Sequence, residues 1–350
     1  MQPAEDAFVI VARPAERIAI AAAGVVTPVG QDVEAFWSSL VTGASGISQI
    51  ERFPVGDLRV GRGGEIKKLS RIKSWSRIPD CRATRFLISA ADELIVQAGF
   101  RPLPVDPARV AVVVGTALAV GADLLRHGEA DAVVAGGCDI LCRFVMCGFD
   151  ALRSLTRDVV RPFDRRRSGL LLGEAAALVL LRRERDGGGA RLGTLLGYGS
   201  ASDASHIAAP DPTGQGLERA IRAALGQAGV APADLDFVSA HGTGTALNDR
   251  VETAALKRAL GARARAIPVN SIKPSMGHTM GAAATLEAIM CLLASRRGLI
   301  PATLHLEEPD PECDLDYVPG RARAGRPRIS LSTSLGFGGC NAALVLEGGA

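Results

Sequence analysis

The sequence predicts a layered α/β protein built from two similar halves, residues 1–200 and 201–350. Its predicted strands are apolar throughout rather than alternating, which indicates sheets covered on both faces. Strands and helices alternate along the chain, and each half leads from a strand to an alanine-rich helix. The segment 282–293 is apolar nearly all round and is predicted to be buried, and 117–125 is its weaker counterpart. We expect these two helices of small residues to pack together between two sheets.

In the first half, residues 44–80 are expected to be irregular and residues 1–16 to form a loose leader. The helix predicted over 83–98 places Phe86, Ala90 and Leu94 on one stripe, and Gly99 stands where a C-terminal glycine belongs. The other helices are predicted over 32–40 and 117–127. Strands are predicted over 17–25, 110–114, 132–137, 175–181 and 192–199, the last two separated by a turn at 187–189.

The second half repeats this alternation. A helix over 217–228 carries an apolar inner face, and further helices are predicted over 249–260 and 282–293. Strands are predicted over 237–240 and 267–270. A closing strand pair, 329–334 and 342–346, surrounds the glycine turn 336–339.

Composition excludes several classes of protein. The chain has 350 residues, 47% of them hydrophobic, and 40 basic against 37 acidic residues give a formal charge of +3. This balance argues against nucleic acid as the main partner. No signal peptide is recognised at the N-terminus, and the most apolar stretch, 110–125, is too short and interrupted to span a bilayer. We expect no membrane association and a cytoplasmic location.

The seven cysteines are odd in number and scattered. Cys138, Cys142 and Cys147 are the only close group, and no second pair with metal-site spacing accompanies them. We therefore expect reduced thiols rather than a metal site, with these three and Cys340 packed as small buried hydrophobes.

Two histidine segments are candidates for chemistry. His241 ends a strand and is followed by glycines, so its imidazole can face a cleft that backbone approaches closely. Lys273 and His278 lie between a strand and the buried helix, whose positive end favours a neutral imidazole, as does the nearby ammonium group. The alternatives are a structural histidine after a strand, and a solvated lysine with a capping histidine.

The third candidate is the turn from Ser334 to Asn341. Three glycines around Phe337 suit a tight turn whose N–H groups can form an oxyanion hole. A phosphate-binding loop is the rival interpretation, but the spacing Gly-x-x-x-x-Gly-Lys is absent. A purely structural turn is the other alternative.

Together these segments resemble the β-ketoacyl-acyl carrier protein synthase family of thiolase-fold condensing enzymes. The resemblance runs from about residue 17 to residue 347 and is most specific in the C-terminal half. It rests on Thr27-Pro28-Val29-Gly30, Ala135-Gly136-Gly137, Arg161-Pro162-Phe163-Asp164, Gly173-Glu174, His241-Gly242-Thr243-Gly244-Thr245, Lys273, Gly277-His278 and Gly336-Phe337-Gly338-Gly339.

The resemblance implies a thiolase-like αβαβα fold and a decarboxylative Claisen condensation of an acyl thioester with malonyl carrier protein, in fatty acid or polyketide biosynthesis. It implies that His241 and His278 hold the malonyl thioester carbonyl and that Lys273 supports His278. Phe337 and Gly338 form the oxyanion or gate group, in which the Phe337 N–H would serve the oxyanion hole and Phe337 itself would gate the acyl pocket. Supporting roles fall to Asp249, Glu252 and Glu287. No cofactor is expected, because phosphopantetheine arrives on the carrier protein.

The family's nucleophilic cysteine has no counterpart in this sequence. The family places it just before the helix that matches 117–127, where this chain passes from Val114 through Gly115 and Thr116 to Ala117. Several dozen residues of the family are absent at this point, so the N-terminal half is shortened. Three explanations are open: a segment missing from an otherwise ordinary enzyme, a natural deletion with little activity, or a non-condensing relative. The last would be a malonyl decarboxylase or a non-catalytic partner subunit.

The implied partners are acyl and malonyl thioesters on an acidic carrier protein, and a second subunit in a homodimer or heterodimer. A basic group ahead of the helix 83–98 is a candidate docking surface for the carrier. It consists of Lys67, Lys68, Arg71, Lys73 and Arg77. A second basic group, 165–167, is the rival, and an ordinary solvated surface is the alternative to both.

Overall fold

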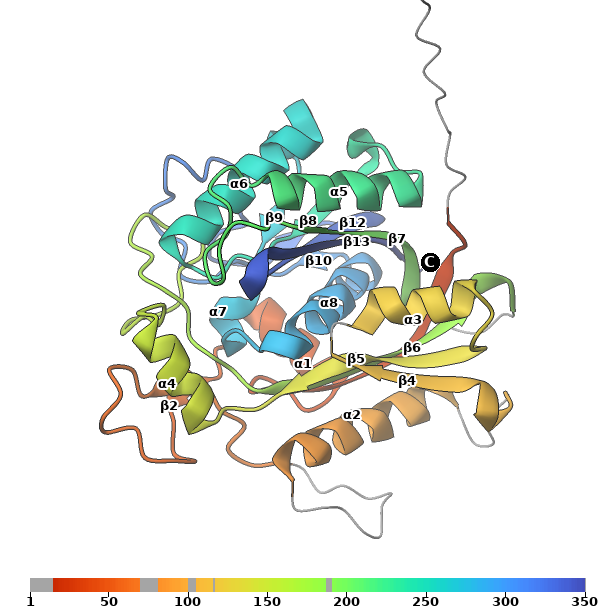
Figure 1. Ribbon diagram of the computed structural model, residues 1–350, viewed down its shortest axis with the longest axis horizontal. Helices are drawn as coiled ribbons and strands as arrows, with labels where there is room; N and C mark the ends of the chain where they lie inside the picture. Colours follow the sequence, from red (N-terminus) through yellow and green to blue (C-terminus); the bar gives the residue numbers. More distant parts are fainter. Residues whose placement is uncertain (1–14, 70–80, 100–104, 116, 187–190, 350) are drawn as a thin grey trace, which may run out of the picture.

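The computed structural model describes residues 15–69, 81–99, 105–115, 117–186 and 191–349. Figure 1 shows five layers, in which two layers of strands alternate with three layers of helices. This confirms the predicted layered α/β fold. The predicted leader up to residue 14 and the turn 187–189 lie outside the described residues.

The first strand layer and its helices come from the first part of the chain. Its strands are β1 (Ile18–Val26), β4 (Val110–Val114), β5 (Ala132–Asp139) and β6 (Ala175–Arg183). Its helices are α1 (Val33–Thr42), α2 (Arg82–Ala98), α3 (Ala117–Arg126) and α4 (Arg143–Ala151), and two short strands, β2 (Ile47–Gln49) and β3 (Arg62–Gly64), pair with each other.

The second strand layer follows. Its strands are β7 (Gly193–Ser202), β8 (Phe237–Ser239), β9 (Val269–Asn270), β12 (Ile329–Gly336) and β13 (Cys340–Gly348). Its helices are α5 (Gln215–Ala228), α6 (Ala246–Leu260), α7 (Lys273–Met276) and α8 (Ala283–Arg297). A small separate pair consists of β10 (Leu299–Ile300) and β11 (Arg323–Ala324).

Helix ends follow the chemistry of the sequence. Asp32 caps α1 by accepting a hydrogen bond from the N–H of Ala35 at 2.7 Å. Gly43 and Gly99 end α1 and α2 in the left-handed conformation, with φ of 74° and 65°. The predicted glycine stop after residue 98 is thereby confirmed.

The two strand layers are hydrogen-bonded into one sheet, whereas the sequence predicted two. Within the described residues the strand order is β4-β5-β6-β1-β7-β13-β12-β8-β9. Strand β1 joins the layers because it pairs with β6 along its length and with β7 only over Ile18–Ile20. The register of β1 shifts between Ile20 and Ala22, so the strand leaves β7 there and the sheet folds around the central helices.

The central helices α3 and α8 lie between the strand layers, as predicted (Figure 1). Twelve of the fifteen residues of α8 are buried, from Ala283 to Ser295 with one exception. Leu118, Ala122 and Leu125 of α3 belong to the same core cluster as the apolar residues of α8. Helices α5 and α6 cover the outer face of one layer and α2 that of the other (Figure 1).

The structure also bears on one unpredicted helix and on the predicted boundary between the two halves. Helix α4 was not predicted, although its Met146 and Phe149 are buried. The boundary at residue 200 stays a prediction, and β7 runs through it. In the described part of the chain, no helix is both long and apolar enough to cross a membrane.

Candidate active site

His241 lies directly beyond β8 and is held by its backbone. The carboxylate of Glu252, on α6, accepts hydrogen bonds from the N–H groups of His241 and Gly242 at 2.7 and 2.8 Å. The same carboxylate accepts the hydroxyl hydrogen bond of Thr333 at 2.7 Å, and Glu252 is fully buried. Gly242 has a φ of 39°, which a side chain would disfavour. Glu252 thus fixes the direction in which the His241 imidazole leaves the strand.

His278 follows α7 and is also fixed on both sides of its backbone. Its N–H donates to the carbonyl of Leu171 at 2.7 Å, and its carbonyl accepts from the N–H of Gly173 at 3.0 Å. A Cβ at Gly173 would lie 2.0 Å from the carbonyl oxygen of Met276, so only glycine allows this approach. Glycines in the motifs around Gly173 and Gly277 therefore allow the backbone packing that positions His278.

The two imidazoles meet edge to face. Their ring centroids lie 5.2 Å apart with an interplanar angle of 87°. The Nδ1 atoms of both rings are buried and have no hydrogen-bond partner in the described part of the chain. A proton on Nδ1 would be a buried donor without an acceptor, so we assign the proton to Nε2 in both rings.

Both imidazoles are held neutral. Burial lowers the pKa of His278 to about 3, and the Lys273 ammonium group lowers it further in the same direction. Burial also places the pKa of His241 well below its ordinary value, with contributions from Lys273 and His278. Burial and the Lys273 ammonium group both favour the predicted neutral imidazoles. Each ring can donate one N–H to an oxygen atom without titrating near neutral pH.

Lys273 forms a buried ion pair with Glu287. Its Nζ lies 2.6 Å from the Glu287 Oε1, and the two side chains are 3% and 2% exposed. Burial raises the pKa of Glu287 to about 7 against the opposing attraction of Lys273. A cavity beside the pair is lined by residues of α7, of α8 and of the segment between them, among them Met276, Leu286 and Thr279. The predicted support of His278 by Lys273 is electrostatic in this geometry.

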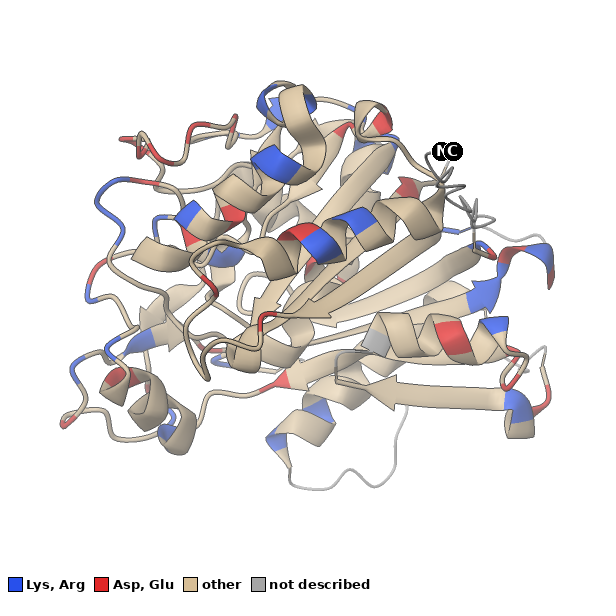
Figure 2. Cartoon of the chain, turned by 45° about the horizontal axis from the view of Figure 1, so that its top comes forward, with Lys and Arg blue, Asp and Glu red and all other residues tan. Residues whose placement is uncertain are grey.

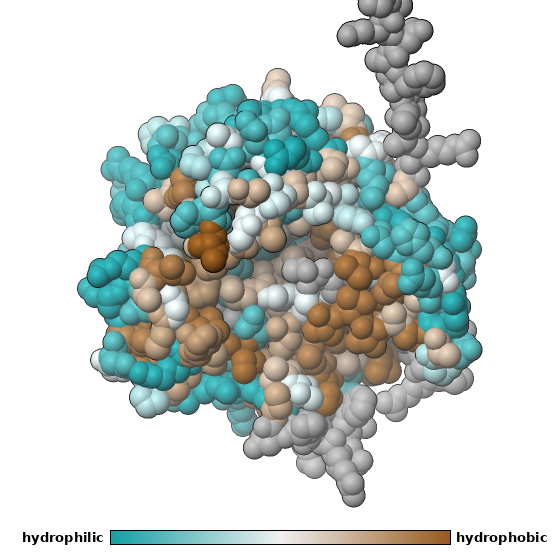
Figure 3. Space-filling model, in the orientation of Figure 1, coloured by the Kyte–Doolittle hydropathy of each residue, from teal (hydrophilic) through white to brown (hydrophobic). Residues whose placement is uncertain are grey.

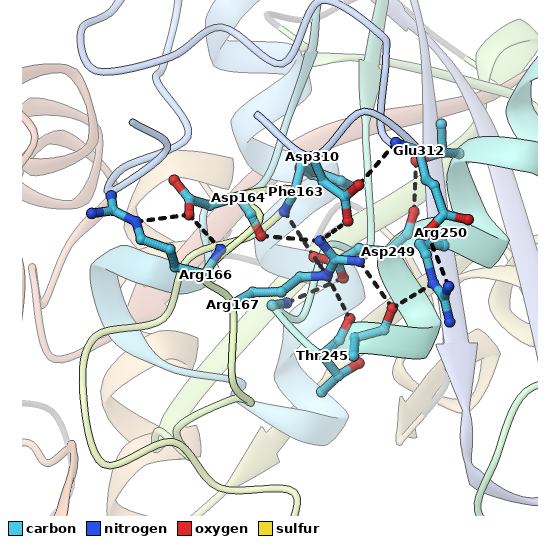
Figure 4. A network of polar contacts seen from close by, with 12 residues as sticks. Phe163, Asp164, Arg166, Arg167, Thr245, Asp249, Arg250, Asp310 and Glu312 are labelled. Carbon is cyan, nitrogen blue, oxygen red and sulfur yellow. Dashed lines mark hydrogen bonds and ion pairs between the residues drawn. The ribbon is translucent and has the colours of Figure 1, made fainter. Parts of the chain in front are cut away.

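Asp249 holds the loop after His241 against the segment that contains Phe163. Its carboxylate accepts from the N–H groups of Phe163 at 2.8 Å and Gly244 at 3.2 Å, and burial raises its pKa to about 6. Figure 4 shows Arg167 between Asp249 and Asp310. Asp249 is therefore a positioning residue for this loop.

The glycine turn from Gly336 to Gly339 uses one of its N–H groups within the fold and exposes its phenylalanine. Gly338 belongs to the predicted oxyanion or gate group with Phe337, and its N–H donates to the carbonyl of Ile207 at 2.7 Å. This hydrogen bond excludes it as a free donor. Phe337 is 50% exposed and stacks on Phe149 of α4, with ring centroids 5.4 Å apart. The roles of the Phe337 N–H in an oxyanion hole and of the Phe337 ring as a gate stay predictions.

The candidate docking residues are only partly described. Arg71, Lys73 and Arg77 lie outside the described residues. Lys67 is paired with Glu65 at 2.6 Å and Glu51 at 3.1 Å, whereas Lys68 is exposed.

The rival basic group, Arg165 to Arg167, is compensated by acidic residues, and Figure 4 draws Arg166 and Arg167 with acidic partners. Figure 2 shows basic and acidic residues interspersed along the chain. Arg165 pairs with Glu308, Arg166 with Asp164, Glu307 and Glu308, and Arg167 with Asp310. Its three cations are therefore less available to an acidic partner than their number suggests.

The cysteines differ more in burial than the sequence predicted. Burial raises the pKa of Cys138 to about 12, which suits an inert thiol. Cys142 and Cys147 are only partly buried and Cys340 is exposed, so the prediction that all four are buried was wrong. Cys142 directly precedes α4, Cys147 lies on α4, and Cys340 begins β13. Among the described residues, no group of three or more histidine, cysteine or acidic side chains is arranged to hold a metal ion.

Sequence reasoning missed three residues of this site. The hydroxyl of Thr333 donates a hydrogen bond to the carboxylate of Glu252, and the carbonyl of Leu171 accepts one from the N–H of His278. The ring of Phe149 stacks on that of Phe337. Each comes from a different element of the fold, and none carries a local motif. Only the apolar pattern of residues 144–149 could have indicated one of them.

Family models describe nearly the whole chain. Residues 15–124 and 116–187 match the model "Beta-ketoacyl synthase, N-terminal domain", and residues 192–307 match "Beta-ketoacyl synthase, C-terminal domain". The N-terminal match comes in two pieces that meet near residue 116, where the sequence places its missing segment.

The chain aligns with curated relatives along nearly their full length. The chain is 34% identical over 415 residues to the tetracenomycin polyketide synthase ketoacyl synthase alpha subunit of Streptomyces glaucescens, covering 95% of this chain and 97% of that protein. It is 32% identical over 407 residues to 3-oxoacyl-[acyl-carrier-protein] synthase 2 of Synechocystis, covering 95% and 98%. Both alignments are longer than the chain, so the relatives carry residues that it lacks.

Solved ketosynthase structures are similar to this chain over nearly its whole length. The ishigamide ketosynthase/chain length factor is 30% identical, with a TM-score of 0.90 over 96% of this chain and all of that one. A Xenorhabdus doucetiae ketosynthase in complex with its chain length factor is 28% identical, with a TM-score of 0.83 over 95% and 98%.

Proposed function

Because this chain belongs to the beta-ketoacyl synthase family, we propose that His241 and His278 together bind the thioester carbonyl of malonyl carrier protein. The family reaction is decarboxylative condensation in fatty acid or polyketide biosynthesis. The observation that carries the proposal is the pair of neutral imidazoles, 5.2 Å apart and each fixed through its backbone.

The decarboxylation step follows from this pair. The bond between the malonyl carboxylate and its α-carbon breaks, carbon dioxide leaves, and the electron pair moves toward the thioester carbonyl. The charge that develops on the carbonyl oxygen accepts two N–H hydrogen bonds, from the Nε2 atoms of His241 and His278. Such donors stabilise the transition state more than the ground state, because they are already oriented.

Condensation then needs an acyl thioester as electrophile. The α-carbon forms a bond to the acyl carbonyl carbon, and the thiolate of the acyl thioester leaves. The family holds that acyl group on a cysteine before the helix that corresponds to α3. In this sequence no cysteine lies between Cys81 and Cys138.

This absence favours a second candidate function. A chain without the acyl-accepting thiol can still release carbon dioxide from a malonyl thioester, since that step uses only the histidines. The product is then an acetyl thioester, after a proton replaces the carboxylate. A partner subunit without either activity is the remaining alternative.

An assay of products separates these functions. The purified chain is mixed with malonyl carrier protein and an acyl carrier protein, and carbon dioxide and the carrier-bound products are quantified by mass spectrometry. We expect carbon dioxide together with a ketoacyl product. Carbon dioxide with acetyl carrier protein alone supports the decarboxylase. Release no faster than in buffer overturns the proposed role of the histidine pair.

The carrier protein is the proposed partner, and Lys68 is a proposed contact. The double variant Lys68→Glu and Arg71→Glu is expected to weaken carrier binding, more strongly at low salt, because salt screens the attraction between opposite charges. Binding is measured by titration calorimetry at two salt concentrations. Arg321→Glu, a charge reversal at an exposed arginine outside this basic group, is the matched control. Equal affinities of the two variants would exclude this docking surface.

The setting of the reaction follows from these substrates. The phosphopantetheine group belongs to the carrier, so the chain needs no cofactor of its own, and a cytoplasmic location suits the carrier proteins. A dimer is supported by the similar solved structures, two of which are described as a ketosynthase with its chain length factor.

A further inference from the structure

The two imidazoles of the site are carried by different segments of the chain. His241 follows β8, whereas His278 follows β9 and α7. Strands β8 and β9 are parallel neighbours, and the N–H of Ala240 donates to the carbonyl of Asn270 at 2.8 Å where both strands end. The paired strands therefore stop just short of His241, and the spacing of the rings depends on contacts made beyond them.

The side-chain hydroxyl of Ser271 makes such a contact. Its Oγ donates to the carbonyl of Gly242 at 2.8 Å. The same Oγ accepts from the N–H of Lys273, the first residue of α7, at 3.4 Å. One hydroxyl thus joins the residue that follows His241 to the helix that leads to His278.

Ser271 is also fixed by its surroundings. A Cβ at Gly242 would lie 2.6 Å from the Cβ of Ser271, so the two residues pack as closely as a glycine allows. The N–H of Ser271 donates to the hydroxyl of Thr303 at 3.1 Å, and Thr303 is fully buried. The backbone of Ser271 is therefore held on one side while its hydroxyl holds Gly242 on the other.

Solvent offers this hydroxyl no substitute partner. Ser271 is 0% exposed, and it follows β9, at the end of the sheet opposite β4. Figure 3 shows apolar surface gathered over the side of the molecule where β4 and α3 lie, away from these contacts. A buried hydroxyl has to find its partners inside the protein, and those of Ser271 belong to the two segments that carry the histidines.

We propose that Ser271 is a positioning residue that sets the spacing of the His241 and His278 imidazoles. The inference rests on the proposed function, in which both rings donate to one thioester oxygen. Two donors stabilise the same oxygen only when both lie within reach of it, and a displacement of about 1 Å can lower a rate by about 100-fold. Ser271 acts through the two backbones and not on the substrate.

Kinetics of carbon dioxide release from malonyl carrier protein test this role. Ser271→Ala is expected to lower kcat about 10-fold and to leave KM within about twofold, because the variant shifts the donors without removing a substrate contact. Ser271→Cys retains a weak S–H donor and should recover part of the loss. Circular dichroism confirms that the variants are folded, and the cysteine variant supplies the comparison if the alanine variant is not.

Thr27→Val is the matched control. The hydroxyl of Thr27 is also buried, donates to the carbonyl of Gly30 at 2.9 Å and accepts from the N–H of Val29 at 3.2 Å. Its loss removes the same kind of hydrogen bonds in a turn after β1, so kcat should not change. An equal fall of kcat in this control would assign the effect to general loss of stability and overturn the proposal.

A spectroscopic readout tests the spacing without relying on activity. In protein labelled with ¹⁵N histidine, Ser271→Ala should shift the ring nitrogen signals of His241 and His278, while the exposed His206 and the Thr27→Val variant show no change. If the unmodified chain released no carbon dioxide, the proposed function would fail, and the ring signals would still decide the role of Ser271. Unshifted signals of both histidines in Ser271→Ala would overturn that role whatever the rate.

Discussion

Replacing His278 with alanine is expected to lower carbon dioxide release from malonyl carrier protein by about 10²–10³-fold, the usual effect of removing one oriented oxyanion donor. In the proposed mechanism, the variant removes one of the two N–H groups that donate to the thioester oxygen. The backbone contacts of residue 278 with Leu171 and Gly173 do not involve the imidazole, so they are retained. The rate is measured at saturating substrate, and thermal unfolding checks the fold.

Two companion variants separate hydrogen bonding from a structural role. His278→Gln keeps a side-chain N–H donor and should recover part of the lost rate, which a packing defect would not. His127→Ala removes an exposed imidazole beyond the end of α3 and should leave the rate unchanged. If the alanine variant at 278 released carbon dioxide as fast as the unmodified chain, the histidine pair would have no part in this step.

The dependence on pH offers a second readout of the same pair. The pKa of His278 is lowered to about 3, so this imidazole stays neutral from pH 8 down to about pH 5. The rate per folded molecule should therefore show no loss near pH 6.5 from this group. Stability behaves differently: a histidine with a depressed pKa contributes stability that is complete above the unfolded value of 6.5 and declines as the pH falls below it.

The elements of the fold were predictable where burial is uniform. Apolar strands such as Ala175–Arg183 and glycine-terminated helices such as Arg82–Ala98 carry local signals that the tertiary structure does not override. Helix α4 escaped prediction because its Phe144 is 86% exposed and Gly148 interrupts the pattern. The joining of the two strand layers depends on three pairs between β1 and β7, which no sequence pattern specifies.

The site was predictable only in part, for a related reason. His241, Lys273 and His278 stand in recognisable segments, but their convergence arises from the packing of α7 and the loop after β8. The N–H of Gly338 is not a free donor, because Ile207, more than 100 residues earlier in the chain, accepts it. Nothing local in the sequence places these two residues opposite each other.

Lys273→Met is expected to destabilise the fold by about 3–5 kcal/mol, the usual cost of removing one partner of a buried ion pair. The ammonium and carboxylate groups lie 2.6 Å apart and are 3% and 2% exposed, so neither has water as a substitute partner. The Oε2 atom of Glu287 already has no hydrogen-bond partner among the described residues, so loss of Lys273 removes the hydrogen bond that its Oε1 atom accepts. Unfolding in urea measures the change.

The double variant Lys273→Met and Glu287→Leu should regain most of that stability, because replacing both charges with apolar groups removes the unpaired carboxylate. If the double variant were as unstable as Lys273→Met, the loss would come from packing rather than from a stranded charge. The pH separates these cases as well. In Lys273→Met the carboxylate of Glu287 loses the attraction that opposes its raised pKa, so this variant should become less stable as the pH rises through 7, whereas the double variant should not.

The ion pair also lowers the pKa values of both histidines through Lys273. Its removal should therefore move the acid limb of the decarboxylation rate toward neutral pH even in the double variant, which links the stability of this pair to the chemistry of the site.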